Sequence, residues 1–237
     1  MKKFNYILNG SLALLLVLIT SLFLFPHVDN KKSNEITPVK EKVNYKDKII
    51  KKELIHNPSN RITIDGVLDN RIMDDDGSYY YLDHNLDGVA DQTGMTIIDF
   101  RTNFETRKTI LYAHSTIAGN GPFQALQNYA NNKEYYENHK YINIKYNDKD
   151  YKYEIFSVYL SLAEDRNSEE LEYFYNTEYL DVEWERIIKK YKNKSQYDTG
   201  VEVNKDDKIL ILQTCSMDPD YYEKYYRYNI LIMAKQI

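Results

Sequence analysis

An uncharged and largely apolar run of residues covers positions 4–25, directly after Lys2 and Lys3. A helix needs about 20 such residues to cross a bilayer, and lysines before the run favour a cytoplasmic N-terminus. The stretch LFPHVDN that follows has no small-x-small motif for a signal peptidase, which favours an uncleaved anchor over a cleaved signal peptide. We therefore predict a single-pass membrane anchor over residues 1–28, with the rest of the chain extracellular at the cell membrane.

The pattern becomes polar after this anchor. Residues 29–43 are rich in lysine, contain one proline and show no periodicity, which is typical of a linker. From residue 41 to residue 56, apolar side chains recur at a spacing that suits a helix packed on the following domain. The residues Asn57-Pro58-Ser59 end this helix. Residues 44–237 then form one domain of ordinary size.

Short β-branched and aromatic runs, separated by polar turns, dominate this domain. Seven of them are clear: RITID (61–65), MTIIDF (95–100), TILYAH (109–114), YINIKY (141–146), YKYEIFSVYLS (151–161), KILILQTC (208–215) and YNILIMAK (228–235). Seven or eight strands of this length predict a closed or nearly closed β-barrel, because closure leaves no unpaired sheet edge.

Two segments between these runs have the pattern of helices. Residues 121–139 predict one or two short helices. Residues 181–194 predict a longer helix, with one apolar stripe made of Trp184, Ile187, Ile188 and Tyr191. The predicted fold is therefore mainly β, with an N-terminal helix and helices between the strands.

The charge and the cysteine content reduce the number of possible functions. The net charge is −5 and no stripe of Lys and Arg with interleaved aromatic residues is present, so nucleic-acid binding is not expected. The single cysteine, Cys215, can form no disulfide within the chain. Outside the cell a thiol that is in no disulfide is exposed to oxidation, so its presence in this domain points to a function for Cys215.

A cysteine nucleophile needs a basic partner, because the thiolate is the reactive form. Of the five histidines, His114 ends the run 109–114 and precedes the turn STIAGNG, at the kind of strand end where a side chain can reach a cleft. Taken alone, such a histidine is more often a hydrogen-bonded structural residue. Arg227 directly precedes the last run, and its guanidinium can stabilise an oxyanion. A surface salt bridge is the other interpretation of Arg227.

Several stretches, taken in order, resemble those of class B sortases, the membrane-anchored cysteine transpeptidases of Gram-positive bacteria. They are YYLDHN, TILYAHS, GPFQALQNYANNKEYYENHKYI, YKYEIFSVYL, KNKSQYDTGVEVNKDDKILILQTC and the trailing Arg227. The resemblance covers residues 41–237 and implies the eight-stranded sortase barrel. Three details depart from the usual pattern: ILQTC replaces TLSTC, YAHS replaces YGHN, and the connection from Cys215 to Arg227 is slightly long.

The resemblance implies roles for three residues and a reaction. Cys215 would be the nucleophile, His114 the general acid and base, and Arg227 the group that stabilises the oxyanion or orients the substrate. The partners would be a sorting-signal peptide with an NPxTN-like motif, cleaved after its Thr through a thioester, and an amine of a peptidoglycan precursor. No cofactor is implied. Pilin polymerisation, hydrolysis and a catalytically silent peptide-binding barrel stay as alternatives.

The substrate groove has four candidate residues. Thr177 and Tyr179 lie on the long segment between YEIFSVYL and DKILILQTC, and Gln213 and Thr214 are next to the predicted nucleophile in the sequence. We expect the bound peptide to contact this set.

The stretch DHNLDGVADQTG contains two further candidates, His84 and Asn85, for a supporting role behind the catalytic residues. Its first half matches a calcium-binding loop, but Gly94 stands where such a loop requires a glutamate. We therefore predict a surface turn rich in Asp and Asn, and no metal site.

Overall fold

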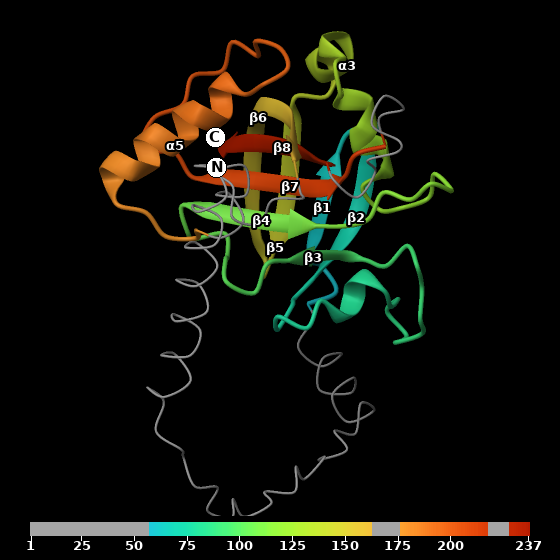
Figure 1. Cartoon of the computed structure of the whole chain (residues 1–237). Helices are drawn as coiled ribbons and strands as arrows, with labels where there is room; N and C mark the ends of the chain where they lie inside the picture. Colours follow the sequence, from blue (N-terminus) through green and yellow to red (C-terminus); the bar gives the residue numbers. More distant parts are fainter. Residues whose placement is uncertain (1–56, 163–175, 218–227) are drawn as a thin grey trace, which may run out of the picture. The chain divides into compact units, whose positions relative to one another are not determined.

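The computed structural model describes residues 57–162, 176–217 and 228–237, all of which belong to the compact unit Asn44–Ile237 (Figure 1). Four predicted features lie outside the described residues: the anchor (1–28), the linker (29–43), the helix that ends at residue 56, and Arg227. In the part of the chain that is described, no helix is both long and apolar enough to span a membrane.

Eight strands close into a barrel (Figure 1). They are β1 (Arg61–Ile64), β2 (Leu68–Met73), β3 (Thr96–Ile98), β4 (Lys108–Tyr112), β5 (Tyr141–Tyr146), β6 (Lys149–Leu162), β7 (Ile209–Cys215) and β8 (Tyr228–Gln236). Their order around the barrel is β1-β2-β3-β4-β7-β8-β6-β5. The β2–β3 and β4–β7 pairs are parallel and the other pairs are antiparallel. The predicted eight-stranded barrel is confirmed.

Strand β2 is the barrel strand that the apolar pattern does not predict. Its sequence, LDNRIM, has polar residues at its centre, and only its last two residues are buried. It forms a strand because its backbone pairs with β1 on one side and with β3 on the other. Pairing with neighbours outweighs the weak β propensity of Asp and Asn here.

The barrel is filled by alternate residues of its strands, since successive side chains of a strand point to opposite faces. One core cluster contains buried residues from all eight strands, among them Ile62, Ile72, Ile98, Leu111, Ile142, Ile155, Leu212 and Ile232. The short helices η2 (Gln124–Tyr129) and α3 (Lys133–Asn138) add Leu126, Tyr129 and Tyr136 to this cluster. They correspond to the helices predicted within 121–139.

The opposite face of β4, β6, β7 and β8 is also buried. Ile110, Ile211, Leu231 and Phe156 lie there in a second core cluster. Helix α5 (Asp181–Asn193) covers it with the predicted apolar stripe: Trp184, Ile187, Ile188 and Tyr191. The indole N–H of Trp184 donates a hydrogen bond to the carbonyl of Asp207 at 3.1 Å, which ties α5 to the segment that leads into β7. The predicted helix 181–194 is therefore present.

Candidate active site

The parallel strands β4 and β7 bring His114 and Cys215 side by side. Their register runs from Lys108 opposite Ile209 to Tyr112 opposite Gln213. One step further, the N–H of Ala113 donates to the carbonyl of Gln213 at 3.4 Å. Continuing the same register places His114 opposite Cys215, on strands that lie about 4.8 Å apart. Two residues that are about a hundred positions apart in the sequence thus meet at the carboxyl ends of neighbouring strands.

The two side chains point away from the barrel interior. Ile110 and Tyr112 on β4 belong to the outer core cluster, and so do Ile209 and Ile211 on β7. Strict alternation puts His114 and Cys215 on this same face, just beyond the buried residues. Both are half-buried, so part of each side chain stays accessible to a substrate.

The inward-facing neighbours of the pair are joined to each other. Ser115 follows His114, Thr214 precedes Cys215, and their hydroxyl oxygens lie 2.9 Å apart in a hydrogen bond. Both residues are buried. This bond extends the contact between the two strands beyond the backbone ladder, next to His114 and Cys215 in the sequence. Thr214, predicted to contact substrate, therefore uses its hydroxyl inside the protein.

A buried carboxylate lies beside β4 on the side away from β7, where the N–H of Asp99 donates to the carbonyl of Ile110 at 2.9 Å. Asp99 follows β3 and is fully buried, and it accepts hydrogen bonds from the hydroxyl of Tyr112 at 2.6 Å and from the guanidinium of Arg101 at 2.6 and 2.9 Å. Burial alone would raise the pKa of Asp99, but the bonds from Arg101 and Tyr112 outweigh it and hold that pKa below its usual value. The carboxylate therefore stays charged and fixes Tyr112, two residues before His114.

The structure does not bring Tyr179 to this pair. The hydroxyl of Tyr179 lies 2.9 Å from the ammonium of Lys108, which also donates to the carbonyl of Asn176. Lys108 is the first residue of β4, six residues before His114, which corresponds to ~20 Å along an extended strand. Thr177 lies between Asn176 and Tyr179 in the chain. These two groove candidates thus belong to a segment held at the opposite end of β4.

Gln213 is close to Cys215 on the same strand. It pairs with Tyr112 of β4 and Leu231 of β8, and alternation puts its side chain on the face that carries Cys215. Its side-chain oxygen is buried, and no hydrogen-bond partner for it is found among the described residues. A buried amide oxygen is costly to leave unbonded, but this atom has less than 1 Å² of exposed surface, so a peptide could bond to it only after the side chain moves.

His84 and Asn85 form a self-contained turn. The ring of His84 stacks on Tyr80 at 4.0 Å, and its Nδ1 bonds to the carbonyl of Tyr80 and to the carboxylate of Asp83. The side-chain oxygen of Asn85 accepts from the backbone N–H groups of residues 87 and 89. These bonds stay within the loop and none reaches His114 or Cys215. Over the described ranges, no group of three or more His, Cys, Asp or Glu side chains is arranged for a metal ion.

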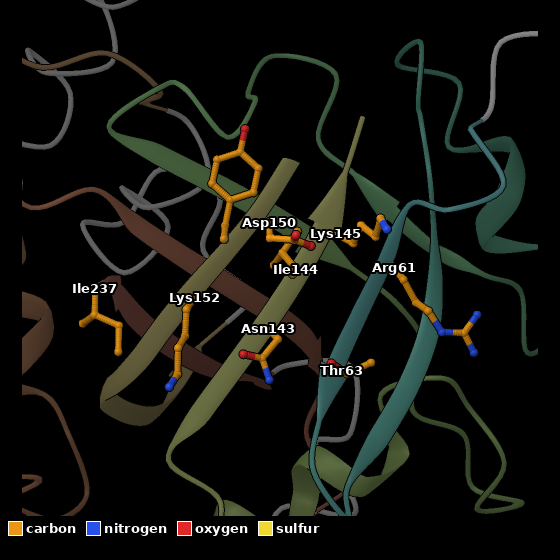
Figure 2. Close-up of a pocket in the computed structure, with 9 residues that line it drawn as sticks. Arg61, Thr63, Asn143, Ile144, Lys145, Asp150, Lys152 and Ile237 are labelled. Carbon is orange, nitrogen blue, oxygen red and sulfur yellow. The ribbon is translucent and has the colours of Figure 1, made fainter. Parts of the chain in front are cut away.

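A separate depression lies on the outer surface of β1, β5 and β6 (Figure 2). Its volume is about 460 Å³, and Arg61, Thr63, Asn143, Lys145, Asp150 and Lys152 are among its lining residues. Lys145 and Asp150 are directly opposite each other on β5 and β6, so their charges offset. Neither His114 nor Cys215 lines this depression, which is therefore distinct from the pair described above.

Similarity to known proteins accords with this geometry. A model of the Sortase domain matches residues 84–237. Sortase B of Listeria monocytogenes is 30% identical over 161 residues, which cover 67% of this chain and 62% of that relative, so the match spans less than two thirds of the relative's length.

Solved structures agree with the fold. The structure of Clostridium perfringens sortase B is 25% identical, with a TM-score of 0.64, and the match covers 81% of this chain and 99% of that one. A sortase B complexed with triglycine is also 25% identical with a TM-score of 0.64, over 81% of this chain and 84% of that one. Since the family model covers well over half of the sequence, this chain belongs to the sortase family, and within it to class B.

Proposed function

We propose that this protein is a cysteine transpeptidase that cleaves a sorting-signal peptide and attaches the released surface protein to a cell-wall amine. The observation that carries the proposal is the register of β4 and β7, which pairs Tyr112 with Gln213 and, when continued by two residues, sets His114 opposite Cys215. A thiol and an imidazole on neighbouring strands form the minimum set for acyl transfer, since the base activates the thiol and then returns a proton.

In the first step the thiolate of Cys215 attacks the carbonyl carbon of the Thr residue in an NPxTN-like motif. A tetrahedral oxyanion forms, the C–N bond breaks, and the imidazolium of His114 gives its proton to the leaving amine. The product is a thioester between Cys215 and the new C-terminus of the surface protein. Two moderate barriers thus replace one large barrier for direct amide exchange.

In the second step an amine attacks the thioester, His114 accepts the proton that the amine loses, and the Cys215 thiolate leaves. The new amide joins the surface protein to the amine, which we assign to a peptidoglycan precursor. The solved sortase B that is complexed with triglycine supports a peptide amine as the acceptor class.

Two further elements of the proposal involve residues outside the described ranges. Arg227 directly precedes β8, and β8 pairs with β7 so that Cys215 is opposite Asn229. We assign to Arg227 the stabilisation of the oxyanion, because a guanidinium stays charged and donates in a fixed planar geometry. We assign residues 1–28 to the membrane anchor, which would hold the enzyme at the surface where both substrates occur.

The test uses the full chain in detergent, incubated with a panel of NPxTN-type peptides and hydroxylamine. Intact-mass measurement should detect an acyl adduct on the enzyme, and the peptide product should be a hydroxamate cut after Thr. The Cys215→Ala variant is the matched control and should give neither species.

Two other results of this experiment would each indicate a different function. If the peptide is cleaved to a free carboxylic acid even when an amine acceptor is added, the enzyme is a hydrolase. A folded protein whose thiol reacts with iodoacetamide, but which forms no adduct with any peptide of the panel, would contradict the transpeptidase proposal and favour a silent peptide-binding barrel.

A further inference from the structure

A single glutamine side chain connects the two strand ends that carry His114 and Cys215. Gln127 lies in η2, the short helix that follows the loop after His114. Its side-chain nitrogen donates to the hydroxyl of Ser115 at 3.0 Å and to the carbonyl of Cys215 at 3.0 Å. Its side-chain oxygen accepts from the N–H of Met217 at 2.7 Å. All three polar positions of the amide, two donors and one acceptor, are therefore used.

These contacts begin where the backbone pairing ends. The β4–β7 register is defined up to Tyr112 and Gln213, and the bond from Ala113 that follows is long, at 3.4 Å. Beyond this point Gln127 holds the residue after His114 on one strand, and the backbone before and after Ser216 on the other. On its other side Cys215 is held by its pairing with Asn229 of β8.

The neighbouring glutamine has a narrower role. The side-chain oxygen of Gln124 accepts from the N–H of Thr116 at 2.8 Å, which holds only the loop after His114. Gln127 is thus the member of η2 that contacts both strand ends. Its hydrogen bonds go to the backbone of Cys215, the backbone of Met217 and the hydroxyl of the residue after the histidine, so its effect on chemistry would be exerted through position.

We propose that Gln127 is a positioning residue, which sets the separation of Cys215 and His114 by bonding to both strand ends. This inference rests on the proposed function of the pair. Reacting groups must be held within a fraction of an ångström, and a misplacement of about 1 Å from outside the reacting atoms can lower a rate ~100-fold. Loss of the Gln127 bonds should therefore reduce the rate of acylation and leave peptide binding unchanged.

The experiment compares wild type with Gln127→Met, which keeps the length of the side chain and removes all three hydrogen bonds, in the full chain in detergent. Single-turnover acylation by an NPxTN-type peptide should slow ~10- to 100-fold with KM unchanged. Asn128→Ala, at the exposed next position of η2, is the matched control and should react like wild type.

A second readout needs no peptide. The rate of alkylation of Cys215 by iodoacetamide, measured across pH, reports how closely a basic or cationic partner activates the thiol. Gln127→Met should alkylate more slowly than wild type near neutral pH and show an altered pH profile, with an unchanged circular dichroism spectrum. If the proposed function itself is wrong, the wild-type protein will form no adduct with any peptide. The alkylation rates of wild type and Gln127→Met can still be compared in that case, so the two failures are distinguishable.

The outcome can overturn the inference in three ways. A folded Gln127→Met protein with the acylation rate and alkylation profile of wild type would do so, and so would a change confined to KM. If Gln127→Met does not fold, Gln127→Glu decides, since it keeps the acceptor for Met217 and loses the donor to the Cys215 carbonyl. It should show the same loss of rate. Failure of both variants to fold would assign Gln127 a purely structural role.

Discussion

Gly121 lies against the backbone of His114 so closely that a Cβ atom on Gly121 would stand 2.1 Å from the His114 carbonyl oxygen. The same carbonyl accepts a hydrogen bond from the N–H of Phe123 at 3.0 Å. The loop after His114 therefore folds back onto the histidine itself, and a side chain at position 121 would have to displace one of the two segments.

We expect Gly121→Ala to lower acylation ~10-fold or more, because it would shift the backbone that carries the imidazole. The matched control is Gly119→Ala in the same loop. A Cβ at Gly119 meets nothing within 4 Å, although its φ of +78° means that alanine costs about 1 kcal/mol of backbone strain. Equal activity losses in the two variants would show that loop strain, and not contact with His114, is responsible.

Cys215→Ala and His114→Ala should each abolish adduct formation. Both residues stand at strand ends on the outer face and are half-buried, so their loss should change stability by less than ~0.5 kcal/mol and the melting temperature by less than ~2 °C. Intact-mass measurement and thermal unfolding monitored by circular dichroism check both parts. Residual turnover close to wild type in Cys215→Ala would refute the proposed mechanism.

Arg227→Lys should lose most of the activity even though it keeps the positive charge. A single ammonium cannot reproduce the planar pair of donors that a guanidinium offers to an oxyanion. Single-turnover acylation should fall while folding is unchanged. Wild-type rates in this variant would mean that Arg227 acts only as a charge or as a surface residue.

Tyr179→Phe should leave KM for the peptide unchanged, because the hydroxyl of Tyr179 bonds to Lys108 at the end of β4 that is remote from Cys215. Removal of one partner of a buried lysine should instead cost about 1 kcal/mol of unfolding free energy. Urea unfolding and peptide kinetics on the same preparation separate the two effects. A raised KM with unchanged stability would return Tyr179 to the substrate groove.

Asp99 should make stability depend on pH in the acid range. Its pKa is lower in the folded protein than the value of about 3.9 expected in the unfolded chain. Its stabilising effect is therefore complete above about pH 4 and is lost as the pH falls through the folded pKa.

The variant Asp99→Asn isolates this effect from that of other carboxylates. It should lower unfolding free energy by about 3 kcal/mol near neutral pH, since Arg101 loses a buried partner. The difference between wild type and variant should then shrink below about pH 4. Unfolding curves at several pH values that keep a constant difference would contradict this assignment.

The sequence predicts this fold well where apolar periodicity is strong. The runs that form β4, β7 and β8, and the stripe of α5, are recognisable because each buries a regular set of side chains. Strand β2 is not, because its residues are mostly polar and it is fixed by pairing with β1 and β3. The parallel contact between β4 and β7 also depends on barrel closure, which no local pattern encodes.

Prediction of the site is limited in the same way, because its contacts join segments that are far apart in the sequence. Cys215 and His114 are identifiable from residue type and strand ends, and the roles that we propose for them come from the resemblance to sortases. Tyr179 is predicted to contact substrate because it lies on the long segment between β6 and β7, and its hydroxyl lies 2.9 Å from the ammonium of Lys108 at the start of β4. Gln127 carries no signal in the sequence, since its contacts arise only when η2 folds back across both strand ends.

The parallel pairing of β4 and β7 has a consequence for the timing of activity. These strands are separated by about a hundred residues, and β7 must also pair with β8, the last strand of the barrel. Contacts between such distant segments form slowly, because the entropy of closing a long loop must be overcome first. A partial barrel in which β7 has not yet paired with β4 has no thiol beside His114, so such an intermediate would be unable to acylate, and activity would begin only once this long-range pairing has formed.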